Sequence, residues 1–342
     1  MKALLIAPNV GGFYQDIIDE LQRRGYETDY IWDAFDKDDP DFIHSSHFGE
    51  GENQKKKFLA KAKIYWQEML NRQEYAKAYD LLFVIDGKML HPYLFDTLRR
   101  RNSKMRSLNY LFDTTRGNYR FNVNSKYFDR VVTYDLQDAK EFGWDFMPIP
   151  WIESPKKVPN SLSFFAMGTF NQSRYELFSF IEKISKENDL RSYIKLYTQK
   201  IRFYPIKFIA NLFLRRKSYI SPYIYYSSLI VNKFISKDEF TKMMLESEVI
   251  VDSIDPRQDG LTARCTWALG AEKKIITNNK SIKTYDFYTP DQIYVIDDFS
   301  NKTKQDILIF MNKKFIMSDE TRQKIRTFRM DNWLVSLLSN PK

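Results

Sequence analysis

The chain has 342 residues, of which 43% are hydrophobic and 16% aromatic, so its composition excludes a disordered protein and suffices for two folded domains. A single cysteine, Cys265, excludes a disulfide framework, indicates a reducing cytoplasmic compartment and is interpreted as a small buried residue. The formal net charge of +9 leaves nucleic acid, anionic membranes and phosphorylated substrates open, but the charge is local, because residues 36–52 are acidic and residues 195–217 strongly basic.

The first half alternates predicted strands and helices. Strands are predicted over residues 3–7, 28–32, 81–85, 108–112 and 131–133. Helices are predicted between them: one ending at Gly25, one over 55–78, one opened by His91 and Pro92, and one between Asp135 and Gly143. Residues 1–8 are too short for a secretory signal, and no stretch approaches the roughly 20 apolar residues of a membrane span.

Four prolines within residues 147–159 mark a domain boundary, since proline cannot donate to a sheet ladder. The second half then repeats the alternation. Strands are predicted over 163–167, 193–197, 249–251, 274–277 and 293–296, and helices over 173–184, 236–246, 261–269 and 318–338. Ser173–Glu176 and Ser236–Glu239 have the capping-box pattern. We therefore predict an α/β protein with Rossmann-like domains over 1–150 and 151–317 and a C-terminal helix over 318–342.

The junction after the strand at 163–167 is the first candidate site. Gly168 lets a ligand approach the backbone, Thr169 follows it, and Arg174 lies in the first turn of the next helix. A helix N-terminus attracts anions, and an anion held there would offset the unfavourable position of Arg174. The alternative is a plain capped helix with an exposed arginine.

The junction after the strand at 249–251 is the second candidate. Ligands bind beyond the carboxyl ends of strands in open parallel sheets, and here a polar loop leads into an apolar helix. The candidate residues offer backbone amides, a hydroxyl and positive charge to a diphosphate: Arg257, Asp259, Gly260, Leu261 and Thr262, with Arg264 as a second cation. The alternative is a tight turn in which Asp and Gly serve geometry only.

In the first half, Gly11 and Gly12 follow the first strand but do not form a dinucleotide-binding fingerprint. Asp86 and Lys88 follow the third strand, and Asp113 ends the fourth. A carboxylate there faces the crevice and is placed to take a proton from an attacking hydroxyl, which makes Asp113 the candidate base. The alternative is an Asp that caps the next segment, and His91 is interpreted as a helix cap.

No catalytic metal is predicted. His44 and His47 lie among aspartates, a pattern more typical of a solvated acidic loop than of a cation site. The segment Lys200–Lys217 is amphipathic and basic and is interpreted either as a membrane-surface helix or as a helix packed on its own domain. Its aromatic and basic residues also suit single-stranded nucleic acid, but no nucleic-acid motif accompanies them, so no such partner is predicted.

Several motifs resemble bacterial capsule and lipopolysaccharide glycosyltransferases of GT-B architecture. They are residues 259–279, the Tyr285–Tyr288 segment, residues 109–113 and residues 128–135. The resemblance implies two Rossmann-like domains facing across a cleft, with the nucleotide-sugar held by the C-terminal domain and the acceptor by the N-terminal domain. It implies that the Gly168-Thr169 loop and the helix start at Asp259–Thr262 hold the diphosphate. It also implies that Gly11, Gly12, Asp86 and Lys88 lie on the acceptor side, and that no metal or other cofactor is needed.

This chain departs from the family in two respects. The family's E-x₇-E pair has no clear counterpart, because Glu272 lies past Gly270, and the Gly-rich N-terminal loop is reduced to Gly11-Gly12. We therefore expect a cytoplasmic glycosyltransferase that acts on a surface glycan or lipid-linked acceptor. If Lys200–Lys217 is a membrane-surface helix, the protein is peripheral on the inner membrane face. The alternative is a non-catalytic glycan- or nucleotide-binding subunit of a membrane-associated assembly.

Overall fold

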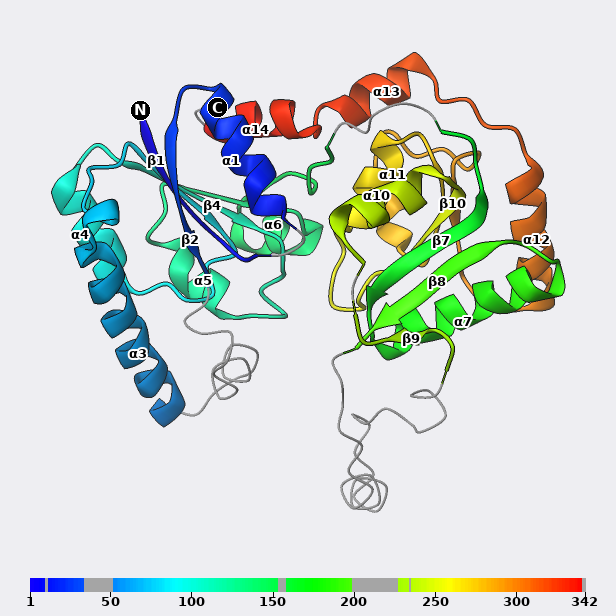
Figure 1. Ribbon diagram of the computed structural model, residues 1–342, viewed down its shortest axis with the longest axis horizontal. Coiled ribbons are helices and arrows are strands. Elements are labelled where there is room, and N and C mark those ends of the chain that lie inside the picture. Colours follow the sequence, from blue (N-terminus) through cyan, green and yellow to red (C-terminus); the bar gives the residue numbers. More distant parts are fainter. Residues whose placement is uncertain (10–11, 34–51, 153–157, 199–226, 234, 340–342) are drawn as a thin grey trace. The chain divides into compact units, whose positions relative to one another are not determined.

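The computed structural model describes residues 1–9, 12–33, 52–152, 158–198, 227–233 and 235–339 (Figure 1). The chain divides into two compact units. Unit 1 comprises Met1–Glu153, Arg257–Gly270 and Asp319–Lys342, and unit 2 comprises Ser154–Pro256 and Ala271–Ser318. The first boundary falls within the proline-rich segment. Unlike the predicted spans, this division assigns residues 257–270 and the C-terminal helices to unit 1.

Unit 1 is built on a six-stranded parallel sheet in the order β2-β1-β3-β4-β5-β6. Its strands are β1 (Lys2–Ala7), β2 (Glu27–Trp32), β3 (Leu81–Ile85), β4 (Arg106–Leu111), β5 (Arg130–Thr133) and β6 (Asp145–Phe146). Its helices are α1 (Phe13–Arg23), α3 (Glu52–Asn71), α4 (Pro92–Arg101), α5 (Arg120–Ser125), α6 (Leu136–Phe142), α11 (Ala263–Gly270), α13 (Asp319–Arg326) and α14 (Met330–Leu338), with a 3₁₀ turn η1 at Gln73–Tyr75.

Helices cover both faces of this sheet, as the apolar runs of β1 and β3 predict. On one face, Trp66 of α3 and Phe95 of α4 pack with Leu4 and Val84 of the strands. On the other face, Trp333 of α14 contacts Phe83 and Tyr110, and α14 packs against α1. Because all the strands are parallel, the loops that follow their carboxyl ends lie along one edge of the sheet.

Unit 2 repeats the plan with the strand order β12-β11-β10-β7-β8-β9, again all parallel. Its strands are β7 (Leu162–Thr169), β8 (Ser192–Tyr197), β9 (Ile230–Val231), β10 (Ser247–Asp252), β11 (Lys274–Thr277) and β12 (Ile293–Val295). Its helices are α7 (Gln172–Glu187), α10 (Lys237–Leu245) and α12 (Asn301–Asn312), with a 3₁₀ turn η2 at Lys280–Thr284. Phe164 packs with α7 and α12, whereas its neighbour Phe165 contacts Phe240 of α10 on the opposite face.

The structure confirms several predicted helix ends. His91 accepts a hydrogen bond from the Tyr93 amide with Pro92 at the first helical position, and Asp135 accepts one from the Asp138 amide. Gly143 ends α6 in a left-handed conformation, and Ser236 and Glu239 form the predicted capping box.

Other predicted ends are wrong. Asn171, not Ser173, caps α7, because its side chain accepts the Arg174 amide at 2.7 Å. The helix predicted over 318–338 is two helices, interrupted where the chain pairs with Trp151 through Phe328 and Met330. The helix predicted over 55–78 ends at Asn71.

Some predictions lie outside the described residues: Gly11, His44, His47 and Lys200–Lys217. Within the ranges that are described, no helix is both long and apolar enough to cross a membrane.

Candidate active site

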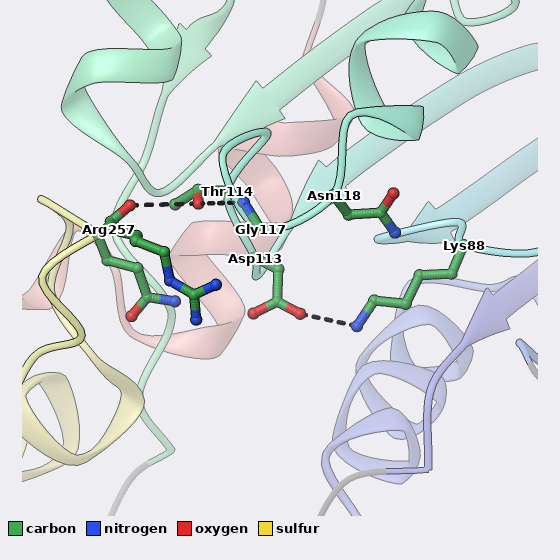
Figure 2. Close-up of a pocket in the computed structure, with 7 residues that line it drawn as sticks. Lys88, Asp113, Thr114, Gly117, Asn118 and Arg257 are labelled. Carbon is green, nitrogen blue, oxygen red and sulfur yellow. Dashed lines mark hydrogen bonds and ion pairs between the residues drawn. The ribbon is translucent and has the colours of Figure 1, made fainter. Parts of the chain in front are cut away.

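A pocket of about 290 Å³ lies in unit 1, beyond the carboxyl ends of β3 and β4 (Figure 2). It is lined by Lys88, Asp113, Thr114, Gly117, Asn118, Arg257 and Gln258. Such an edge is where ligands bind in open parallel sheets. Lys88 and Asp113 were predicted as candidates from their places after β3 and β4, and the structure brings them together.

Asp113 and Lys88 form an ion pair in this pocket. The Lys88 Nζ donates to Asp113 Oδ2 at 2.8 Å. The Asp113 side chain is 44% exposed, and within the described part of the chain no partner contacts its Oδ1. In Figure 2 the Arg257 side chain extends toward Asp113 from the side opposite Lys88. One carboxylate oxygen is therefore fixed by a cation and the other is left for a ligand.

Two buried carboxylates, those of Asp86 and Asp33, contact this ion pair or the backbone that carries it. Asp86 Oδ1 accepts the amides of Phe112 at 2.7 Å and Asp113 at 3.1 Å, and Asp86 Oδ2 lies 3.7 Å from Lys88 Nζ. Asp33, at the end of β2, accepts the amides of Lys88 and Met89.

The titration of these groups follows from burial and from their mutual attraction. Burial raises the pKa of Asp86 and that of Asp33, because it disfavours the charged form, and Lys88 opposes both shifts. Burial acts to lower the pKa of Lys88, but the attraction of Asp86 and Asp113 outweighs it and raises that pKa. Lys88 therefore stays protonated at neutral pH.

The loop after β4 is held by two buried acids, the N-cap of α6 at Asp135 and Asp138 in the first turn of that helix. The Thr115 amide and hydroxyl donate to Asp138 at 2.7 and 2.8 Å. Arg116 donates to Asp135 at 2.8 Å, to Asp138 at 3.3 Å and to the Arg257 carbonyl at 2.8 Å. Sequence reasoning missed this network, although Asp135 had been placed correctly as a helix cap.

Asn118 also lines the pocket and was not predicted. Its side-chain Oδ1 accepts a hydrogen bond from the backbone amide of Arg120 at 3.1 Å. Its own backbone amide donates to the Thr114 carbonyl, so both the side chain and the backbone of Asn118 are held in place. The residue is 4% exposed, and its Nδ2 has no hydrogen-bond partner among the described residues. Unsatisfied buried donors are rare and often mark functional positions.

The predicted second diphosphate junction lies in unit 1. The Asp259 amide donates to Asp135 Oδ2 at 2.7 Å, and the Thr262 hydroxyl accepts the Cys265 amide at 3.2 Å, capping α11. Leu261 is fully buried. Gly260 lies so close to Tyr134 that an added Cβ would be 2.1 Å from its carbonyl oxygen. These contacts explain the need for glycine at 260, and the predicted diphosphate contacts of this segment stay predictions.

The first predicted diphosphate junction lies in unit 2. The Arg174 guanidinium donates to the Thr169 carbonyl, to the Thr169 hydroxyl at 3.2 Å and to the Ser253 carbonyl at 3.2 Å. A Cβ on Gly168 would be 3.1 Å from the Arg174 side chain, so the absence of a side chain at position 168 leaves room for Arg174. Arg174 thus joins the loops after β7 and β10, and Asn278 after β11 contacts both the Ser173 hydroxyl and the Ile254 amide.

Gly12 precedes α1 in a left-handed conformation, with φ of 74°, which favours glycine. In the described part of the chain, no group of three or more His, Cys, Asp or Glu residues is arranged to hold a metal ion.

No family model matches the chain, and no curated protein matches its sequence. Solved structures do match its fold. An α-glucosyltransferase in complex with UDP and a 13-mer DNA is 14% identical with a TM-score of 0.51, covering 98% of this chain and 95% of the other. MurG of Acinetobacter baumannii is 10% identical with a TM-score of 0.50, covering 98% of each chain.

A third match is UGT2 of Phytolacca americana, in complex with UDP-2-fluoro-glucose and pterostilbene. It is 8% identical with a TM-score of 0.51, and the match covers 98% of each chain. At such low identity the likeness concerns the fold. Two parallel α/β units and matches of this coverage show that the chain has the GT-B fold.

Proposed function

We propose that the chain is a glycosyltransferase that moves a sugar from a nucleotide-sugar to an acceptor hydroxyl, with Asp113 as the base. The observation that carries the proposal is the half-exposed Asp113 carboxylate at the pocket wall, with Oδ2 fixed by Lys88. The fold supports it, because the structures that match this chain include a glucosyltransferase with UDP and UGT2 with a UDP-sugar analogue.

In the proposed reaction, the acceptor lies in the unit 1 pocket, and Asp113 takes the proton of its attacking hydroxyl as the new glycosidic bond forms. The bond between the sugar and the diphosphate breaks, and the diphosphate leaves with the bonding electrons. We assign the diphosphate to the start of α7, where Gly168, Thr169 and Arg174 lie and where the helix dipole favours negative charge. No metal takes part in the proposal.

The acceptor class and location are finer proposals. The acceptor is a surface polysaccharide or lipopolysaccharide precursor, and the protein works in the cytoplasm at the inner membrane face. These statements rest on the motif resemblance and on the basic segment Lys200–Lys217.

Asp113→Asn tests the proposal, and Asp145→Asn is a matched control. Asp145 pairs with Arg130 at 2.7 Å and is 46% exposed, close to the 2.8 Å and 44% of Asp113, but it lies on β6 and does not line the pocket. We expect Asp113→Asn to lower kcat by roughly 10²–10⁴-fold while the thermal shift given by UDP, GDP, CMP or dTDP is retained. Asp145→Asn should keep near-parental turnover.

Retained activity in Asp113→Asn would remove this residue from the mechanism. Nucleotide binding without turnover of any nucleotide-sugar by the parent chain would instead indicate a non-catalytic binding protein.

A further inference from the structure

Three carboxylates contact one lysine of the pocket wall, and the proposed reaction uses only one of them. Lys88 Nζ lies 2.8 Å from Asp113 Oδ2 and 3.7 Å from Asp86 Oδ2, while Asp33 accepts the Lys88 amide at 2.8 Å. Asp86 is only 4% exposed, and it does not line the pocket. Its role must therefore be exerted through its neighbours.

Asp86 holds the backbone that carries Asp113. Its Oδ1 accepts two successive amides, those of Phe112 and Asp113. To reach them the chain turns sharply after β3: Asp86 has a φ of 60° and Gly87 a φ of 80°. A left-handed conformation is costly for a residue with a side chain and persists where surrounding contacts fix it, frequently at functional sites.

Asp86 also contacts the lysine that holds Asp113. Its Oδ2 lies 3.7 Å from Lys88 Nζ, and the same Nζ lies 2.8 Å from Asp113 Oδ2. One buried side chain therefore contacts both the backbone of Asp113 and the cation that fixes its carboxylate.

We propose that Asp86 is a positioning residue for Asp113: its buried side chain fixes the Asp113 backbone and contacts the Lys88 ammonium, so that the Asp113 carboxylate keeps its orientation in the pocket. This inference rests on the proposed function, because it assigns Asp113 the role of base.

Three variants test the proposal through kcat, KM and nucleotide binding. Asp86→Ala removes the oxygen that accepts both amides, so kcat should fall roughly tenfold or more with little change in KM and with the nucleotide thermal shift retained. Asp86→Asn keeps an accepting oxygen and a residue type that tolerates the left-handed backbone, so it should restore most of the parental kcat. Asp145→Asn should behave like the parent.

Unchanged kcat in Asp86→Ala would overturn the proposal. An equal fall in kcat in Asp86→Ala and Asp86→Asn would also overturn it, because the hydrogen bonds to the two amides would then not be what catalysis needs.

A second measurement needs no substrate: hydrogen exchange of the Phe112 and Asp113 amides in the full chain. The proposal predicts that these amides exchange faster in Asp86→Ala than in the parent and in Asp86→Asn, and unchanged exchange would contradict it. If no nucleotide-sugar is turned over by the parent, the proposed function fails, and this exchange still decides the relation between Asp86 and Asp113.

Discussion

Arg116→Met tests whether buried charge holds the wall of the pocket. The guanidinium pairs with Asp135 and Asp138, whose side chains are fully buried, while the Arg116 side chain is 25% exposed. Removing one partner of a buried ion pair costs roughly 3–5 kcal/mol. Because Arg116 is partly exposed and both acids keep backbone donors, we expect unit 1 to lose about 2–3 kcal/mol of unfolding free energy.

The protein offers a direct assay for this loss. All six tryptophans lie in unit 1, at positions 32, 66, 144, 151, 267 and 333. Tryptophan fluorescence during urea unfolding therefore follows unit 1 alone. Arg116→Met combined with Asp138→Asn is the control, and it should recover part of the loss because the amide leaves no unpaired charge at position 138.

The effect of Arg116→Met should also depend on pH. Burial raises the pKa of Asp138 above its unfolded value, so the contribution of this carboxyl to stability is full below the unfolded pKa and is lost as pH rises through the folded pKa. Without Arg116 the folded pKa rises further, and the loss should be small near about pH 4 and full near about pH 8. A loss below about 0.5 kcal/mol, or one equal at both pH values, would refute the reasoning.

Three further predictions concern other parts of the chain. Gly260→Ala should destabilise unit 1 by about 2 kcal/mol or more in the same fluorescence assay, because the new Cβ would meet the Tyr134 carbonyl at 2.1 Å; a neutral result would contradict the close packing of this segment. Arg174→Met should abolish the thermal shift given by the preferred nucleotide, and a full shift would remove Arg174 from the donor site. Ser236→Ala should lower the free energy of opening of α10 by about 1 kcal/mol, seen as faster amide hydrogen exchange in that helix, since it loses the capping box with Glu239; unchanged exchange would show that the cap adds nothing.

The sequence predicted those parts of the fold that depend on local pattern. Apolar runs such as residues 3–7 and 81–85 identified buried parallel strands, and the glycines and caps after them located most helix ends. Asp86, Lys88 and Asp113 were predicted as candidates because each follows a strand, and parallel strands bring such positions to one edge of the sheet. The structure shows that edge and the contacts among the three residues.

The rest depends on contacts between distant residues. Asn171 and Ser173 are both good cap residues, and only the folded backbone decides that Asn171 accepts the Arg174 amide. The interruption of the C-terminal helix follows from pairing with Trp151. The acids that hold Arg116 lie 19 and 22 residues away, and Asn118 carries no local motif, so no spacing could have identified them.

The most direct measurement follows a sugar labelled in the donor. The parent chain, Asp113→Asn and Asp145→Asn are each incubated with labelled nucleotide-sugars and polysaccharide or lipopolysaccharide precursors, and the acceptor is analysed by mass spectrometry. We predict that the acceptor gains one sugar with the parent and with Asp145→Asn, and that Asp113→Asn forms this product at least about a hundredfold more slowly. Equal transfer by all three chains would contradict the role of Asp113, and no transfer from any donor would contradict the proposed function itself.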